Sequence, residues 1–416
     1  MLPVSTTFHR QPGGLRWAWI GALVAFIVAG ATGVLFRFGV AYGATGSLNL
    51  TNVRHAHSHL MYFGWVTPAM MALIWHQLPD RVTALRRRAI GWVVGSVFLA
   101  AAIAYPLFFA FGYSPVAVGD GRMPLAVIGA GLNIFGWYGF LALYAVATRG
   151  VPRTRPLQLW DMALTFMGIA TLGAWGLSLV KPLGLDDPLW MKALTHVFLD
   201  LFSEGWLVLG ALGLIWSILG HSESEARSWS LRLIGAGLPF TFLLALPADS
   251  LSTGLKLVGC AGGAAVGLGL LMNVGQLIAH LPANQRWLWS FPLMLLGLKA
   301  IAQLSNSLVP GVWWASEHGL RVLYLHLMLL GFVSLALVAA ARAIWGGITT
   351  RGAGLFYGAI AAVLLSLLPL TSWWPMGWQG AWAYQTAAWI ALLPVVGAAW
   401  MAGAALRKQL RALVPA

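Results

Sequence analysis

Charged residues are scarce in this chain of 416 residues: they make up 9% of it, while hydrophobic residues make up 59%. A soluble protein carries about 25% charged residues, so the deficit excludes an ordinary water-soluble fold. Inside a lipid bilayer, only helices and closed barrels satisfy their own backbone hydrogen bonds. The alternation of apolar and polar residues that marks a barrel strand is absent, and apolar runs of about 20 residues indicate transmembrane helices instead.

Cysteine is almost absent as well, since Cys260 is the only one. A single cysteine excludes a disulfide framework and every metal or iron–sulfur motif that needs several thiolates. Cys260 lies in the glycine-rich run GCAGGAAVGLGLL. This run favours close packing between helices, because a phosphate-binding loop would need a preceding strand.

Apolar runs separated by charged, proline-rich or glycine-rich turns predict about twelve transmembrane helices in one transmembrane domain that covers residues 1–416. The predicted spans are 17–39, 56–78, 89–111, 124–147, 158–180, 190–219, 230–247, 254–279, 287–308, 319–345, 352–370 and 382–406. The expected fold class is therefore all-α, a polytopic membrane bundle.

The formal net charge of +14 comes from Lys and Arg residues in short loops rather than along one face. Membrane lipid, and not nucleic acid, is therefore the expected partner. The side with both termini carries 17 of the 25 Lys and Arg residues, the opposite side carries seven, and Lys299 lies inside a predicted helix. Because positive loops stay in the cytoplasm, we expect both termini to be cytoplasmic and even-numbered helices to run inward.

Ionisable side chains inside the predicted spans are costly in a bilayer and are therefore candidates for function. They gather in the second, sixth and tenth helices, whose N-terminal ends are expected in the same outer half of the membrane. The candidates are His55, His57 and His59, then His196, Asp200 and Glu204, and finally His318 and His326.

Two neutral imidazoles from facing helices are a common axial pair for a low-spin b-type haem, whose propionates need cations. We expect His57 and His326 to be these axial ligands. Arg54 and Arg321, at the outer ends of the same two helices, are the expected partners of the propionates.

A second site is expected beside the first, because a turn of 100° per residue places His59 on nearly the opposite side of its helix from His57. Copper, iron or zinc could be bound there by His59, His196 and Asp200, with Glu204 as a proton carrier. The alternative is a hydrogen-bonded pair of His196 and Asp200 that fixes helix packing without a metal.

Three segments resemble subunit I of the haem-copper oxidases, including the nitric oxide reductase branch, which is a twelve-helix bundle. His57 begins the run HSHLMYFGWVTPAM, which is similar to the second-helix pattern of the oxidases that starts with the low-spin haem ligand. The run YLHLMLLG from Tyr324 is similar to the tenth helix of nitric oxide reductases. The run DLFSEGW from Asp200 is similar to their sixth-helix HLWVEGF.

The resemblance implies a haem b on His57 and His326, in the bacterial inner membrane. It also implies oxidoreductase activity, with a cytochrome c or quinol as electron donor, NO or O2 as acceptor, and partner subunits. Tyr324 stands where the high-spin haem ligand is expected, and Asp200 where a metal-binding histidine is expected. The dinuclear centre is therefore expected to be lost or rebuilt. A second haem or a non-haem metal would fill it, with Glu204 and Tyr324 as catalytic candidates.

Two other interpretations stay open. The run HSHLMYFG is also similar to a segment of the NnrS family, twelve-helix membrane proteins that contain haem and copper and are linked to nitric oxide stress. From a different class, a proton-coupled transporter without haem also combines twelve helices with buried histidines and carboxylates.

Overall fold

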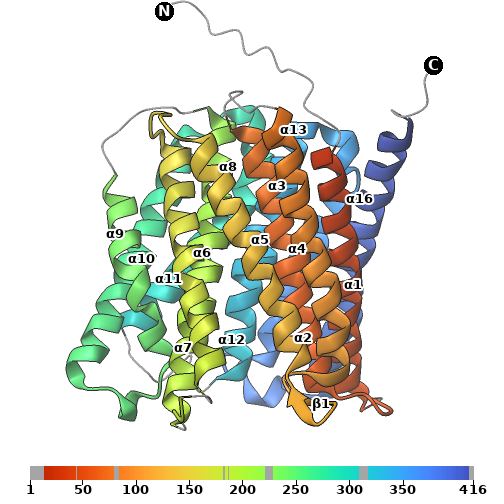
Figure 1. The fold of residues 1–416 in the computed structure, drawn as a ribbon, viewed down its shortest axis with the longest axis vertical. Helices are drawn as coiled ribbons and strands as arrows, with labels where there is room; N and C mark the ends of the chain where they lie inside the picture. The colour runs from red at the N-terminus through yellow and green to blue at the C-terminus, as the bar shows by residue number, and fades with distance from the viewer. Residues whose placement is uncertain are drawn as a thin grey trace, which may run out of the picture.

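The computed structural model describes residues 14–43, 45–78, 84–180, 183–185, 187–220, 228–308 and 317–411. Figure 1 shows a bundle of long helices that run alongside one another. The start of α1 (Gly14–Tyr42) and the end of α16 (Leu392–Arg411) lie at the same, upper end of this bundle. Among the described residues, ten helices are long and apolar enough to cross a membrane. The chain is therefore an all-α polytopic membrane bundle, as its composition predicts.

The two remaining predicted spans are helical too. Residues 50–77 form one continuous helix, and Trp229–Ala245 forms a shorter apolar one. Besides α1, α16 and the three central helices described below, the bundle contains further helices. They are α4 (Ala84–Phe111), α5 (Leu125–Ala147), α6 (Arg155–Leu179), α9 (Trp229–Gly237) with the 3-10 helix η3 (Leu238–Ala245), α10 (Thr253–His280), α11 (Arg286–Leu308), α14 (Ala353–Leu367) with η8 (Leu368–Leu370), and α15 (Ala381–Ile390).

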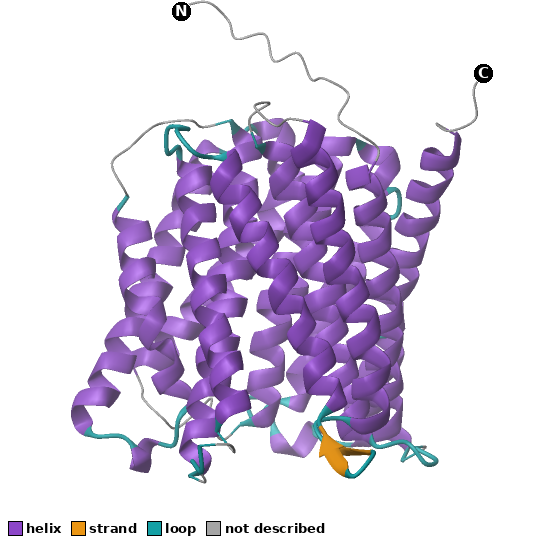
Figure 2. Cartoon of the chain, in the orientation of Figure 1, coloured by secondary structure: helices purple, strands orange, loops and turns teal. Residues whose placement is uncertain are grey.

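A small β-hairpin at the lower end of the bundle is the one sheet among the described residues (Figure 2). Its strands β1 (Val116–Val118) and β2 (Gly121–Met123) lie between α4 and α5 and are antiparallel, with Val118 opposite Gly121. Gly119 makes the tight reversal possible with a φ of 57°, a conformation that side chains other than glycine rarely adopt. Strands this short give no periodic signal in a sequence, which is why the sequence did not predict them.

Three interrupted helices carry the ionisable candidates. The segments are α2 (Leu50–Leu60), η1 (Met61–Val66) and α3 (Thr67–Gln77), then α7 (Pro188–Asp200), η2 (Leu201–Val208) and α8 (Leu209–Leu219), and finally α12 (His318–Leu325), η6 (His326–Ser334) and α13 (Leu335–Trp345). Figure 1 shows α2, α7 and α12 in the lower half of the bundle and α3, α8 and α13 in the upper half. The three helices therefore run in the same direction, as the topology prediction requires.

These three helices converge in the upper half of the bundle and separate in the lower half. In the upper half, α3, α8 and α13 all pack against one another. Every residue of 63–75, 201–216 and 331–341 is buried, as expected for helices at the centre of a bundle. In the lower half α2, α7 and α12 make no comparable contacts with each other, and no residue of α7 is buried. The candidate histidines and Asp200 thus lie in the more open half, whereas Glu204 lies in the buried run 201–216.

The glycine-rich helix α10 packs unusually close to its neighbours. A Cβ added to Gly262 would lie 2.7 Å from the carbonyl oxygen of Gly237 in α9, and one on Gly267 would lie 3.0 Å from that of Ala300 in α11. Small residues let helix backbones approach in this way inside a membrane. The prediction that this run is a helix-packing surface is confirmed.

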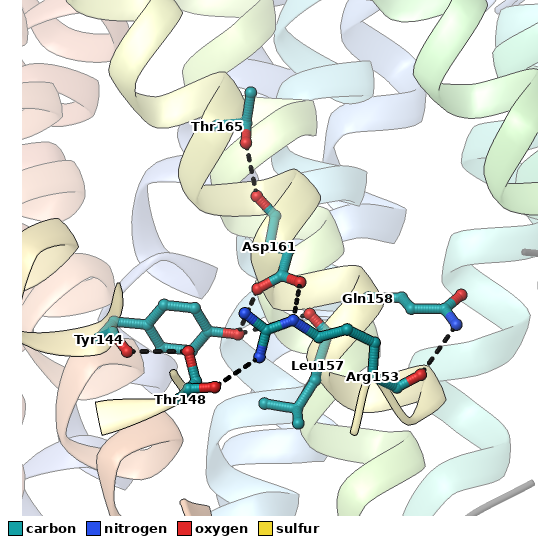
Figure 3. Close-up of polar contacts among 7 residues, drawn as sticks. All are labelled: Tyr144, Thr148, Arg153, Leu157, Gln158, Asp161 and Thr165. Carbon is teal, nitrogen blue, oxygen red and sulfur yellow. Dashed lines mark hydrogen bonds and ion pairs between the residues drawn. The ribbon is translucent and has the colours of Figure 1, made fainter. Parts of the chain in front are cut away.

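Polar side chains join α5 to α6 near the upper end of the bundle (Figure 3). The Asp161 carboxylate accepts a hydrogen bond from the Tyr144 hydroxyl at 2.9 Å and forms an ion pair with Arg153, with Nε and Oδ2 3.0 Å apart. Arg153 also donates to the backbone carbonyl of Thr148. Both ion-pair partners are more than one-third exposed, so the network stabilises the connection only modestly.

The packing of α10 predicts that Gly262→Ala lowers the stability of the protein. Alanine favours a helix over glycine by about 0.5–1 kcal/mol, whereas forcing a methyl group into a close contact typically costs about 1–3 kcal/mol. Thermal unfolding in detergent measures the balance. Gly275→Ala is the matched control in the same helix, because nothing lies within 4 Å of its added Cβ. Equal stability of the two variants would contradict this account.

Candidate functional site

Each of the three central helices changes from α-helix to π-helix at the candidate residues. His57 and His59 lie directly before η1, Glu204 lies within η2, and His326 is the first residue of η6. π-Helical turns are rare and are found frequently at functional sites, because the extra residue changes the direction of the side chains that follow. Three of them at one level therefore mark this part of the bundle as the candidate site.

His57 of α2 points towards α1. Its Nδ1 lies 2.7 Å from the backbone carbonyl oxygen of Ala29. A carbonyl oxygen only accepts hydrogen bonds, so Nδ1 carries the proton and Nε2 keeps its lone pair. Gly33 provides the space for this ring, since a Cβ there would lie 2.7 Å from Cε1 of His57. The ring is thus held in the tautomer that can bind a metal through Nε2.

His326 has the same arrangement. Its Nδ1 lies 2.7 Å from the carbonyl oxygen of Val322, one turn earlier in α12. The Nε2 lone pair is therefore available here too. His326 and His57 are both half-buried and close enough to interact electrostatically. The structure thus places the two histidines that the sequence predicts as haem ligands within range of a mutual electrostatic interaction.

An arginine that the sequence prediction missed accompanies these histidines. Arg37 lies inside α1 and interacts electrostatically with both His57 and His326. Within the described part of the chain it forms no ion pair or hydrogen bond. Its position inside an apolar run was the signal that could have found it. The predicted Arg54 and Arg321 are exposed, and both interact electrostatically with His318 at the start of α12.

His59 faces away from His57, as its position two residues later predicts. Its ring stacks on Phe108 of α4 with the centroids 3.8 Å apart, and its Nε2 lies 3.0 Å from the hydroxyl of Tyr113. Burial raises the pKa of Tyr113, in the loop after α4, so its hydroxyl keeps its proton. His59 is thus engaged on the α4 side of α2.

His196 and Asp200 lie together on α7, without His59. Nδ1 of His196 is 4.0 Å from Oδ1 of Asp200, and the Thr241 hydroxyl donates to Oδ2 of Asp200 at 3.3 Å. Across the described residues, no group of three or more His, Cys, Asp or Glu side chains is placed to hold a metal ion. The structure therefore does not assemble the predicted set of His59, His196 and Asp200. Of these three predicted ligands, it places only His196 and Asp200 near each other.

Glu204 and Tyr324 belong to a second buried cluster, which includes two residues that the sequence prediction did not assign. Glu204 Oε2 forms an ion pair with Lys299 of α11 at 2.8 Å and accepts a hydrogen bond from the Gln303 amide at 3.1 Å. Glu204 Oε1 accepts a hydrogen bond from the Tyr324 hydroxyl at 3.0 Å. Both carboxylate oxygens are thus engaged. A lone Lys in the apolar span 287–308 was the signal that could have found this cluster.

Comparison with known proteins adds no further constraint. No model of a known protein family matches this chain, and no curated protein is similar enough to count as a relative.

Proposed function

We propose that this chain is an integral membrane electron-transfer protein that binds one b-type haem between His57 and His326. The observation that carries this proposal is the matched state of the two imidazoles. Each donates its Nδ1 proton to a backbone carbonyl, and each keeps the Nε2 lone pair that an axial ligand uses. A bound haem would supply one-electron redox chemistry.

The residues around the two histidines fit the other needs of a haem. Arg37 is a cation that interacts electrostatically with both histidines. Arg54 and Arg321 lie near the N-terminal ends of α2 and α12, so the propionates of a haem would have positively charged partners. The helices α2 and α12 are partly exposed in the lower half, in contrast to the buried residues 63–75 and 331–341. These features favour a relation to subunit I of the haem-copper oxidases, with twelve spans if residues 50–77 and 229–245 also cross the membrane.

A haem with two histidine ligands has no open coordination position, which suits electron transfer better than binding of a gas. The protein would accordingly transfer electrons, with a quinol or a cytochrome c as the donor. Reduction of NO or O2 and a role like that of the NnrS family stay predictions from resemblance.

A proton-coupled transporter is the second candidate, and the buried Glu204–Lys299 pair favours it, since ionisable groups inside a bundle often mark transport pathways. The absorption spectrum of the purified protein separates the two candidates. A reduced b-type band supports the haem protein, and a colourless preparation from haem-replete cells supports the transporter.

His57→Ala and His326→Ala are each expected to abolish the low-spin spectrum, because loss of one axial ligand leaves five-coordinate iron or releases the haem. Optical and electron paramagnetic resonance spectra of the purified variants measure this. His55→Ala is the control on the same helix, since His55 packs edge-on against Tyr113 and not towards His326. A bis-histidine spectrum that survives in both variants would show that the assignment is wrong.

Gly33→Ala is expected to disturb the haem while leaving both ligands in the sequence. The added Cβ would lie 2.7 Å from Cε1 and 2.8 Å from Nδ1 of His57, so the ring must move and its bond to Ala29 must weaken. We expect a lower haem content or a shifted low-spin spectrum. Gly131→Ala, where nothing lies within 4 Å, is the control. Identical spectra in the two variants would contradict the proposed role of His57.

We also propose that the chain lies in a bacterial inner membrane with both termini in the cytoplasm, on the basis of the excess of Lys and Arg on that side. A fluorescent protein that matures only in the cytoplasm, fused to the C-terminus, should be bright, and alkaline phosphatase at the same place should be inactive. Because α1 begins and α16 ends at the same end of the bundle (Figure 1), the reverse pattern would place both termini outside and contradict the proposed orientation.

A further inference from the structure

Lys299 is fully buried in the centre of the bundle. Its exposed fraction is 0%, and that of Glu204 is 8%. An ammonium group without a partner in such a place costs several kcal/mol, so its surroundings must compensate the charge. The nearest compensation is the Glu204 carboxylate, whose Oε2 lies 2.8 Å from Nζ.

Oxygen atoms and an aromatic ring from three elements surround this ammonium group. Besides Glu204 of η2, the Gln303 side-chain oxygen accepts a hydrogen bond from Nζ at 2.5 Å, one turn further along α11. Tyr324 of α12 presents its ring 5.6 Å from Nζ and donates its hydroxyl to Glu204. A carboxylate, an amide oxygen and a phenol gathered around one positive charge form the kind of shell that oxygen-ligated cations have in proteins.

We propose that Lys299 is a built-in cation that takes the place of a second metal ion in this membrane protein. The resemblance to haem-copper oxidases leads one to expect a metal near Asp200 and Tyr324, but the residues here do not fit one. The described residues offer no group of three ligands, and a divalent ion beside Glu204 would be repelled by the ammonium group. The ammonium group of Lys299 is instead stabilised by Glu204, Gln303 and Tyr324.

The cluster also positions the helix that carries His326. Tyr324 lies two residues before His326, and its hydrogen bond to Glu204 ties α12 to η2 where η6 begins. Lys299 therefore acts as a positioning residue for this part of the bundle. The inference rests on contacts within the chain and is independent of the proposed haem.

The test uses the full-length protein purified from cells supplied with copper, zinc and iron. Wild-type protein is expected to contain no stoichiometric copper, zinc or non-haem iron. Haem is quantified separately, so absence of haem would overturn the proposed function without touching this inference. Stoichiometric second metal that disappears in Glu204→Gln would overturn the inference instead.

A double-mutant cycle measures the ion pair itself. Lys299→Met leaves the Glu204 carboxylate without its cation and is expected to lower the unfolding temperature by several degrees. Glu204→Gln combined with Lys299→Met is expected to regain much of that loss, because the double variant has no carboxylate that must either stay unpaired or take up a proton. Lys256→Met is the control, since Lys256 lies half-exposed in the first turn of α10. Additive effects of the two substitutions would contradict the pairing.

Infrared spectroscopy measures whether the Glu204 carboxyl group carries a proton, and this measurement does not depend on the stability of a variant. Beside an ammonium group Glu204 is ionised, so Glu204→Gln should remove no protonated-carboxyl band from the wild-type spectrum. Lys299→Met should create such a band, and the double variant should lack it. A protonated-carboxyl band in the wild type that Glu204→Gln removes would overturn the inference.

Discussion

A charge or a polar group inside a bilayer must find its partner within the protein, and this constraint governs the centre of the bundle. Lys299 pairs with Glu204, and Tyr324 donates a hydrogen bond to the same carboxylate. His57 of α2 donates to the backbone of Ala29 in α1. Because these partners come from different helices, the polar contacts also fix how the helices lie against one another.

The shape of the centre follows from how the three interrupted helices pack. Apolar side chains pack α3, α8 and α13 against one another, whereas α2, α7 and α12 separate and remain partly exposed. The change from tight to open packing coincides with the π-helical segments η1, η2 and η6. A π-helical turn widens the helix and redirects the side chains near it. One half of the bundle is therefore tightly packed, and the other half is more open.

Two chemically different sites meet on α12. His326 and His57 keep free Nε2 atoms beside Arg37, which fits an anionic cofactor that needs two axial ligands. Two residues earlier, Tyr324 belongs to a cluster in which Glu204 already has its counter-charge. The first group keeps ring nitrogens without a bond to the chain, and the second has its charges paired within the chain. This contrast is why the cofactor is proposed at the first group and not at the second.

The sequence alone determined the helical membrane architecture. A helix satisfies its backbone hydrogen bonds locally, and each transmembrane helix appears in the sequence as an apolar run of about 20 residues. It also determined that α10 packs closely and that His57 and His59 face opposite ways, since both follow from composition and the 100° period. Only the tertiary structure decided that Lys299 meets Glu204, that Arg37 lies beside His57, and that the second metal-ligand set is not assembled. Those contacts depend on which faces of distant helices meet and on π-helical turns that shift them, and no local pattern encodes either.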